Sequence, residues 1–132
     1  MKAQYIFLFV IIIASMISCK KEAGEGGNYS IIGKIIVRDY NSNFTTLNAE
    51  YNGADEDVYI IYGNEISYGN KIKTNYDGIY EFKYLRKGAY KIYTYSKDSS
   101  MKSKSGTIPL ITNVVINGKN KNADVPDVII FK

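Results

Sequence analysis

The chain has no histidine, no tryptophan, two prolines and a single cysteine among its 132 residues. Without histidine it lacks the commonest general base and the commonest zinc ligand, and catalytic Ser-His or Cys-His arrangements are excluded. One cysteine cannot form a disulfide within the chain. Any enzyme built from this sequence would have to depend on carboxylates, and we expect no cofactor and no metal site.

The first residues have the layout of a secretory signal peptide. A positive start at Met1-Lys2 is followed by an unbroken apolar run from Tyr5 to Ala14. A membrane-spanning helix needs roughly 20 apolar residues, and this run reaches Lys20 too early. We therefore expect residues 1–18 to be a cleaved signal peptide.

The end of that segment, Met16-Ile17-Ser18-Cys19, resembles the lipobox of bacterial lipoproteins. The resemblance implies that Cys19 becomes the lipid attachment site, with acyl chains that anchor the protein to a membrane. Each buried methylene contributes about 0.8 kcal/mol, so two or three acyl chains give stable anchoring. We expect an outer-membrane lipoprotein of the bacterial cell envelope, anchored in either the surface leaflet or the periplasmic leaflet. An ordinary signal peptide or an uncleaved anchor is the alternative.

The remaining chain divides into a short tether and one domain. Residues 19–28 comprise Cys19 and the polar, glycine-rich sequence KKEAGEGGN, which predicts a flexible tether. Residues 29–132 are long enough for one domain with its own core. The net charge of +4 is modest and lysines alternate with acids, so we expect no nucleic-acid partner.

Short segments with the two-residue period of β-strands fill the domain, and turn residues separate them. Asp77-Gly78 and Lys87-Gly88 favour tight turns, and we interpret Asp77-Gly78 as a hairpin. Gly33 suggests a bulge or a close approach within its strand. The pattern predicts an all-β fold, a sandwich of about seven strands. The expected strands cover 30–38, 57–62, 71–75, 79–85, 89–96, 107–116 and 125–131.

One series of residues carries a family resemblance. It consists of Thr74, Asp77-Gly78, Tyr80, Phe82, Leu85, Gly88, Tyr90 and Ile92. This series resembles the T-x-x-D-G-x-Y-x-F-x-x-L-x-x-G-x-Y-x-I signature of carboxypeptidase regulatory-like domains, and Gly33-Lys34-Ile35 is similar to that family's opening strand. The resemblance implies a prealbumin-like β-sandwich. The sequence departs from it between Tyr40 and Asp57, where a polar insertion replaces a short turn.

Tyrosine is the residue type that bears on binding, since 12 of the 13 follow the signal peptide. Alternation sends Tyr93 and Tyr95 to the strand face opposite Tyr90 and Ile92. Two rings about 7 Å apart on an uncovered face could stack on sugar rings, so this pair is the candidate ligand-binding site. The alternative is that these tyrosines are simply good strand formers.

Two charged clusters have weaker functional interpretations. Asp55-Glu56-Asp57 offers oxygen ligands, but consecutive acids do not match the spacing of a calcium loop and favour a solvated turn. Four loop lysines suggest either a basic patch at one end of the domain, able to meet anionic glycans or lipid headgroups, or only a soluble surface. These are Lys102, Lys104, Lys119 and Lys121.

Glu81 is the candidate acid for a hydrolase. It should point outward beside Lys83 and Lys91, which indicates surface ion pairs rather than a catalytic acid. We expect no catalytic residues. The sequence favours a non-enzymatic, lipid-anchored domain that binds a glycan or an envelope protein, or serves as a scaffold. A structural spacer or assembly subunit that pairs by strand addition is the second hypothesis, and a carboxylate-dependent hydrolase is the third.

Overall fold

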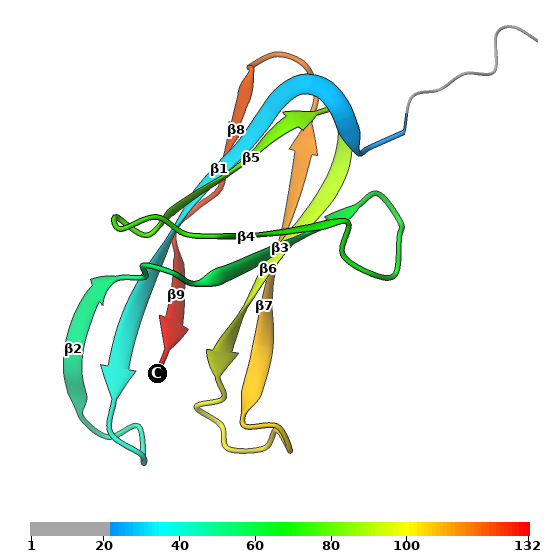
Figure 1. Ribbon diagram of the computed structural model, residues 1–132. Coiled ribbons are helices and arrows are strands. Elements are labelled where there is room, and N and C mark those ends of the chain that lie inside the picture. The colour runs from blue at the N-terminus through cyan, green and yellow to red at the C-terminus, as the bar shows by residue number, and fades with distance from the viewer. Residues whose placement is uncertain (1–21) are drawn as a thin grey trace, which may run out of the picture.

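The computed structural model describes residues 22–132, and each regular element in that range is a β-strand. The strands form two sheets packed face to face (Figure 1), so the predicted all-β sandwich is confirmed. None of these residues forms a helix long and apolar enough to span a bilayer. The strands are β1 (Glu25–Tyr40), β2 (Leu47–Asn52), β3 (Asp57–Tyr62), β4 (Asn70–Lys73), β5 (Ile79–Leu85), β6 (Gly88–Lys97), β7 (Thr107–Ile116), β8 (Asn122–Asp124) and β9 (Val128–Phe131).

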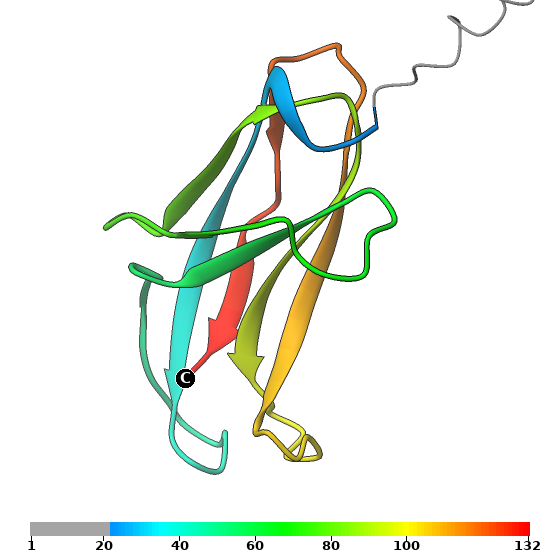
Figure 2. The same cartoon turned by 45° about the vertical axis from the view of Figure 1, so that its right-hand side comes forward.

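The first sheet is built around the long strand β1. Strands β5 and β2 pair antiparallel with successive parts of β1, while β8 and β9 pair parallel with it. Ile31 pairs with both Phe82 of β5 and Ala123 of β8, so β1 lies inside the sheet. Figure 2 shows β2 and β9 on opposite sides of β1. Pro126, which has no N–H to donate, lies between β8 and β9.

The second sheet has the strand order β4-β3-β6-β7. Its longest pairing joins β6 to β7 without interruption, from Gly88 opposite Ile116 to Lys97 opposite Thr107. β3 lies inside this sheet, between β4 and β6. Pro109 lies in the edge strand β7, as expected for a residue that cannot donate to a ladder on both sides.

The core lies between the two sheets and comes from alternate residues of both. Tyr80 and Phe82 of β5 and Tyr90 and Ile92 of β6 are buried, as the two-residue period of a strand places them on one face. A Cβ atom at Gly33 would overlap the ring of Tyr80, so the predicted close approach is confirmed. The buried apolar residues are Ile31, Ile35, Val37, Val58, Ile60, Tyr80, Phe82, Leu85, Tyr90, Ile92, Val114, Ile116, Val125 and Ile130.

The predicted turns are present, but the hairpin interpretation of Asp77-Gly78 is wrong. Gly78 has the positive φ of a tight turn, 78°, and its N–H donates to the carbonyl of Asn75 at 3.0 Å. The strands on either side, β4 and β5, nevertheless belong to different sheets, and so do β5 and β6 around Lys87-Gly88. The chain therefore crosses the sandwich at both turns, because a turn signal specifies a reversal and not a pairing partner.

Two strands were not expected from the sequence, and the domain starts earlier than predicted. β2 forms inside the insertion between Tyr40 and Asp57, and β8 precedes Pro126. β1 begins at Glu25, so residues 25–28, expected in the flexible tether, belong to the first sheet. The predicted signal peptide, residues 1–18, and the lipid-attachment residue Cys19 lie outside the described residues.

The hydroxyl of Tyr90 holds the first residues of the domain in place through hydrogen bonds. The N–H of Gly24 donates to it at 2.9 Å, and the hydroxyl donates to the carbonyl of Arg86 at 2.6 Å. Burial is the main cause of the raised pKa of Tyr90. Gly24 is buried, and its N–H is hydrogen-bonded to a side chain of β6. The chain is therefore already part of the fold five residues after Cys19.

Candidate functional site

Four tyrosines gather on the outer face of the second sheet. Tyr59 comes from β3, Tyr93 and Tyr95 come from β6, and Tyr68 comes from the loop between β3 and β4. We call these four residues the tyrosine cluster. The strand neighbours of Tyr59, Tyr93 and Tyr95 are buried, so these three side chains point outward because alternation sends every second side chain to that face.

The rings of the cluster support one another. Tyr59 and Tyr93 stack at a centroid distance of 4.8 Å and an angle of 7°. Tyr95 meets each of them at 5.8 Å and nearly at a right angle. Tyr68 packs edge-on against Tyr59 at 5.0 Å. Because Tyr59 and Tyr93 cover each other's faces, the open aromatic surface belongs to Tyr68 and Tyr95, which are 50% and 49% exposed.

Charged groups border these rings. The Nζ atom of Lys71 lies 5.8 Å from the centroid of the Tyr59 ring. The carboxylate of Asp57 forms ion pairs with Lys73 at 3.5 Å and with Lys71 at 3.9 Å. The register that pairs Tyr59 with Tyr93 places Asp57 opposite Tyr95. The surface therefore combines exposed rings with donors and acceptors that can bond to hydroxyl groups.

The predicted pair, Tyr93 and Tyr95, lies on one face as expected, but its geometry differs from that expectation. The two rings are perpendicular and 5.8 Å apart, so they do not form a flat double platform. Burial raises the pKa of Tyr93, which stands partly covered within the cluster. The nearly continuous apolar sequence of β3 hides the outward direction of Tyr59, and nothing in the sequence distinguishes the loop residue Tyr68.

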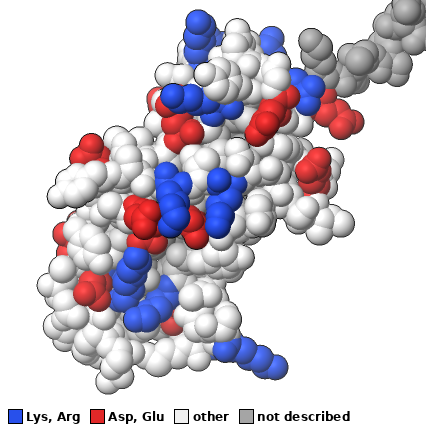
Figure 3. Space-filling view, in the orientation of Figure 1, with Lys and Arg blue, Asp and Glu red and all other residues white. Residues whose placement is uncertain are grey.

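The four loop lysines do not form one patch. Lys102 and Lys104 lie in the loop between β6 and β7, whereas Lys119 and Lys121 lie in the loop between β7 and β8. These loops are at opposite ends of the ten-residue strand β7, so the single basic patch is a wrong interpretation. Figure 3 shows basic and acidic side chains interspersed on one face of the molecule.

The acidic candidates form ion pairs. Asp55 contacts Lys73 at 3.4 Å, and Glu56 pairs with Lys132. Residues 22–132 contain no group of three or more acidic side chains placed to hold a metal ion. Glu81 lies 3.5 Å from Lys83, as expected, but Lys91 is on the other sheet, so that expected contact is wrong.

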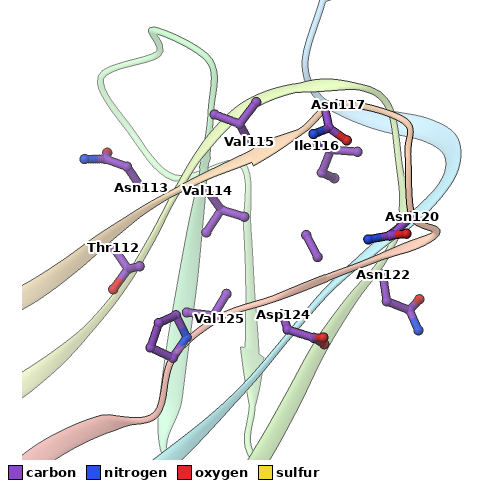
Figure 4. Close-up of a pocket in the computed structure, with 12 residues that line it drawn as sticks. Thr112, Asn113, Val114, Val115, Ile116, Asn117, Asn120, Asn122, Asp124 and Val125 are labelled. Atoms are coloured by element: carbon purple, nitrogen blue, oxygen red, sulfur yellow. The ribbon is translucent and has the colours of Figure 1, made fainter.

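An open pocket of about 350 Å³ lies between β7 and β8 (Figure 4). Val114, Ile116 and Val125 form its apolar floor, and asparagine side chains form much of its rim. Asp124 is the single titratable residue among those that line it. A lone carboxylate does not provide the pair of acids that glycoside hydrolysis requires, so the pocket offers no catalytic arrangement of that kind.

Comparisons with known proteins give the chain no family. No protein-family model matches it, and no curated protein matches its sequence. One similar solved structure is a Pseudomonas aeruginosa protein provisionally described as carbohydrate binding, at 13% identity and a TM-score of 0.48, with 83% of this chain and 92% of that chain covered. Another is (S)-allantoin synthase, at 14% identity and a TM-score of 0.39, with 80% of this chain and 43% of the enzyme covered. The predicted relationship to carboxypeptidase regulatory-like domains stays a prediction.

Proposed function

We propose that this protein is a non-catalytic, lipid-anchored domain of the bacterial cell envelope that binds glycans through the tyrosine cluster. The observation that carries the proposal is the pair of half-exposed rings, Tyr68 and Tyr95, held in place by the Tyr59–Tyr93 stack. An aromatic face packs against the apolar face of a sugar ring, and the Asp57 carboxylate beside it can accept hydrogen bonds from sugar hydroxyls.

The position of the cluster suits an anchored protein. Four residue steps separate Cys19 from Ala23 and span at most about 14 Å, so a lipid on Cys19 would hold the start of the domain close to the headgroups. Ala23 packs against Gly88, where β6 begins. Tyr95 lies seven residues further along β6, about 23 Å from that end. The cluster therefore stands well clear of the anchored end.

The non-catalytic part of the proposal rests on the residue types. The chain has no histidine, and the pocket beside β7 has one titratable side chain. The relationship to carboxypeptidase regulatory-like domains, which rests on the signature between Thr74 and Ile92, also belongs to the proposal. It predicts a binding module rather than an active site.

Glycan binding is tested with a printed panel of host, plant and bacterial glycans, followed by calorimetry with the strongest oligosaccharide. We expect Tyr68→Ala and Tyr95→Ala each to weaken binding about 2-fold to 10-fold, the equivalent of one aromatic contact. Tyr76→Ala is the matched control, because Tyr76 is 90% exposed in the turn before β5, outside the cluster. Absence of binding to the whole panel, or equal losses in all three variants, would overturn the proposal.

Anchoring is tested separately by metabolic labelling with an alkyne-tagged fatty acid. The chain should incorporate the label and fractionate with membranes, and Cys19→Ala should lose both properties. Protease treatment of intact cells, with a periplasmic protein as control, then determines which side of the outer membrane the domain faces. Label incorporation that survives Cys19→Ala would contradict the assignment of the lipid to this residue.

A further inference from the structure

Strand β7 is an edge of the second sheet that no charged side chain protects. In the described part of the chain it pairs with β6 alone. Its sequence, TIPLITNVVI, has ten residues and no charge. The other edge, β4, is short and carries Lys71 and Lys73, the usual protection of an edge against pairing with another chain. Ile111 and Val115 of β7 are nevertheless 57% and 65% exposed.

The hydrogen-bond pattern shows which backbone groups of β7 point off the edge. Asp98 N–H donates to the carbonyl of Gly106 at 2.9 Å, so this position of the β6–β7 ladder is a hydrogen-bonded pair. Such pairs alternate along antiparallel strands, so even-numbered residues of β7 bond to β6. The N–H of Gly63 donates to the carbonyl of Ala89, which confirms that odd-numbered residues of β6 face β3 instead. The residues of β7 whose backbone faces outward are Thr107, Pro109, Ile111, Asn113 and Val115.

We propose that β7 pairs antiparallel with β7 of a second copy of this chain, about a two-fold axis at Asn113. In this register Asn113 bonds to the partner's Asn113, and Ile111 bonds to the partner's Val115. The two exposed apolar residues then cover each other on the outer face, where Figure 4 shows Asn113 and Val115 on the side of β7 opposite Val114 and Ile116. Registers shifted toward Pro109 lose a donor, because proline has no N–H.

A second copy of the chain is the partner that fits this edge, because the strand is complementary to itself. Each outward-facing N–H meets a C=O of the partner across the axis, exposed Ile111 meets exposed Val115, and no charge opposes another. The axis is perpendicular to the sheet, so both tyrosine clusters face the same way. Tyr93 pairs directly with Ile111, so only the strand β7 separates Tyr93 and Tyr95 from the shared edge.

Site-specific disulfide formation tests the register in membranes that contain the full chain. Asn113→Cys should give a disulfide-linked dimer under mild oxidant, because directly opposed Cα atoms are about 5.5 Å apart in a hydrogen-bonded pair. Val115→Cys should not, since that residue lies about 14 Å from the partner's Val115. Adding Ile111→Cys to Val115→Cys should restore the dimer. The unsubstituted chain controls for Cys19.

The mass of the detergent-purified protein provides the second measurement. We expect a dimer that becomes a monomer in Asn113→Pro, which removes an outward donor without breaking a bond to β6. Asn113→Lys, which opposes two like charges at the axis, should do the same if the proline variant fails to fold. A monomeric unsubstituted protein, or disulfide formation as efficient at Val115→Cys as at Asn113→Cys, would overturn the proposal.

Discussion

The ring of Tyr59 lies parallel to the ring of Tyr93 at a centroid distance of 4.8 Å. The same two residues form a cross-strand pair between β3 and β6, so backbone register and ring stacking define one contact. Aromatic pairs of this kind contribute about 0.5–1.5 kcal/mol beyond the area that they bury. The stack is therefore a rigid support for the exposed rings of Tyr95 and Tyr68, which lean on it edge-on.

Replacing one ring of the stack should affect both stability and binding. We expect Tyr59→Leu to lower the free energy of unfolding by about 1 kcal/mol, since leucine keeps apolar burial but loses the aromatic contact. Tyr76→Leu, outside the cluster, should change it by less than about 0.5 kcal/mol. Urea denaturation measures both. If the two variants unfold at the same urea concentration, the stack does not stabilise the sheet.

Two buried tyrosines should respond oppositely to the loss of their hydroxyl. Tyr90→Phe leaves the buried N–H of Gly24 without its acceptor, so we expect a loss of about 1–3 kcal/mol. The hydroxyl of Tyr80 is buried and has no hydrogen-bond partner among the described residues, so Tyr80→Phe should be neutral or stabilising. Denaturant unfolding of this matched pair compares them directly. A larger loss for Tyr80→Phe than for Tyr90→Phe would contradict the roles that the structure gives these hydroxyls.

Local alternation made much of the fold predictable from the sequence. Residues such as Tyr80, Phe82, Tyr90 and Ile92 face the core because a strand has a period of two, and this holds whatever the strand pairs with. The pairing itself was not predictable, because it depends on contacts between distant segments. Thus β5 pairs with β1 and not with its sequence neighbour β6, and the insertion contributes the strand β2, each of whose residues is exposed.

The candidate site was predictable only where it follows the same alternation. Tyr93 and Tyr95 belong to a strand with a clear pattern, so their shared face could be derived. In Asp57–Tyr62 the apolar residues are nearly continuous, and this hid the outward direction of Tyr59. Tyr68 reaches the cluster from a loop whose path depends on tertiary contacts. The orientations of the rings determine which ring faces are exposed. They follow from side-chain packing and cannot be read from the sequence pattern.

Alkaline conditions should destabilise the protein through two tyrosines. Burial, followed by the charge of Asp127, raises the pKa of Tyr80 to about 12, and burial, followed by a hydrogen bond to Glu25, raises the pKa of Tyr62 to about 12. Their ordinary pKa is about 10, so the stability that they contribute is present below about pH 10 and is lost as the pH rises toward 12. Tyrosinate absorbance and urea unfolding across this range measure it. Tyr80→Phe should unfold less readily at high pH than the unsubstituted chain. If both proteins lose the same free energy of unfolding as the pH rises, Tyr80 is not a cause of the alkaline loss.

Asp98 should make the protein sensitive to acid. It lies at the end of β6, where its carboxylate accepts the Ser100 hydroxyl at 2.6 Å and the Ser103 N–H at 2.7 Å. These hydrogen bonds, that of the Ser100 side chain first, lower the pKa of Asp98 to about 2. Because the ordinary pKa is about 4, its contribution is present above about pH 4 and is lost as the pH falls toward 2. Asp98→Asn should therefore melt at a lower temperature than the unsubstituted chain at neutral pH and show a smaller further decrease between about pH 5 and pH 2. Asp77→Asn, at an exposed turn, is the matched control. If the melting temperature of Asp98→Asn falls with acid as steeply as that of the unsubstituted chain, groups other than Asp98 cause the loss of stability.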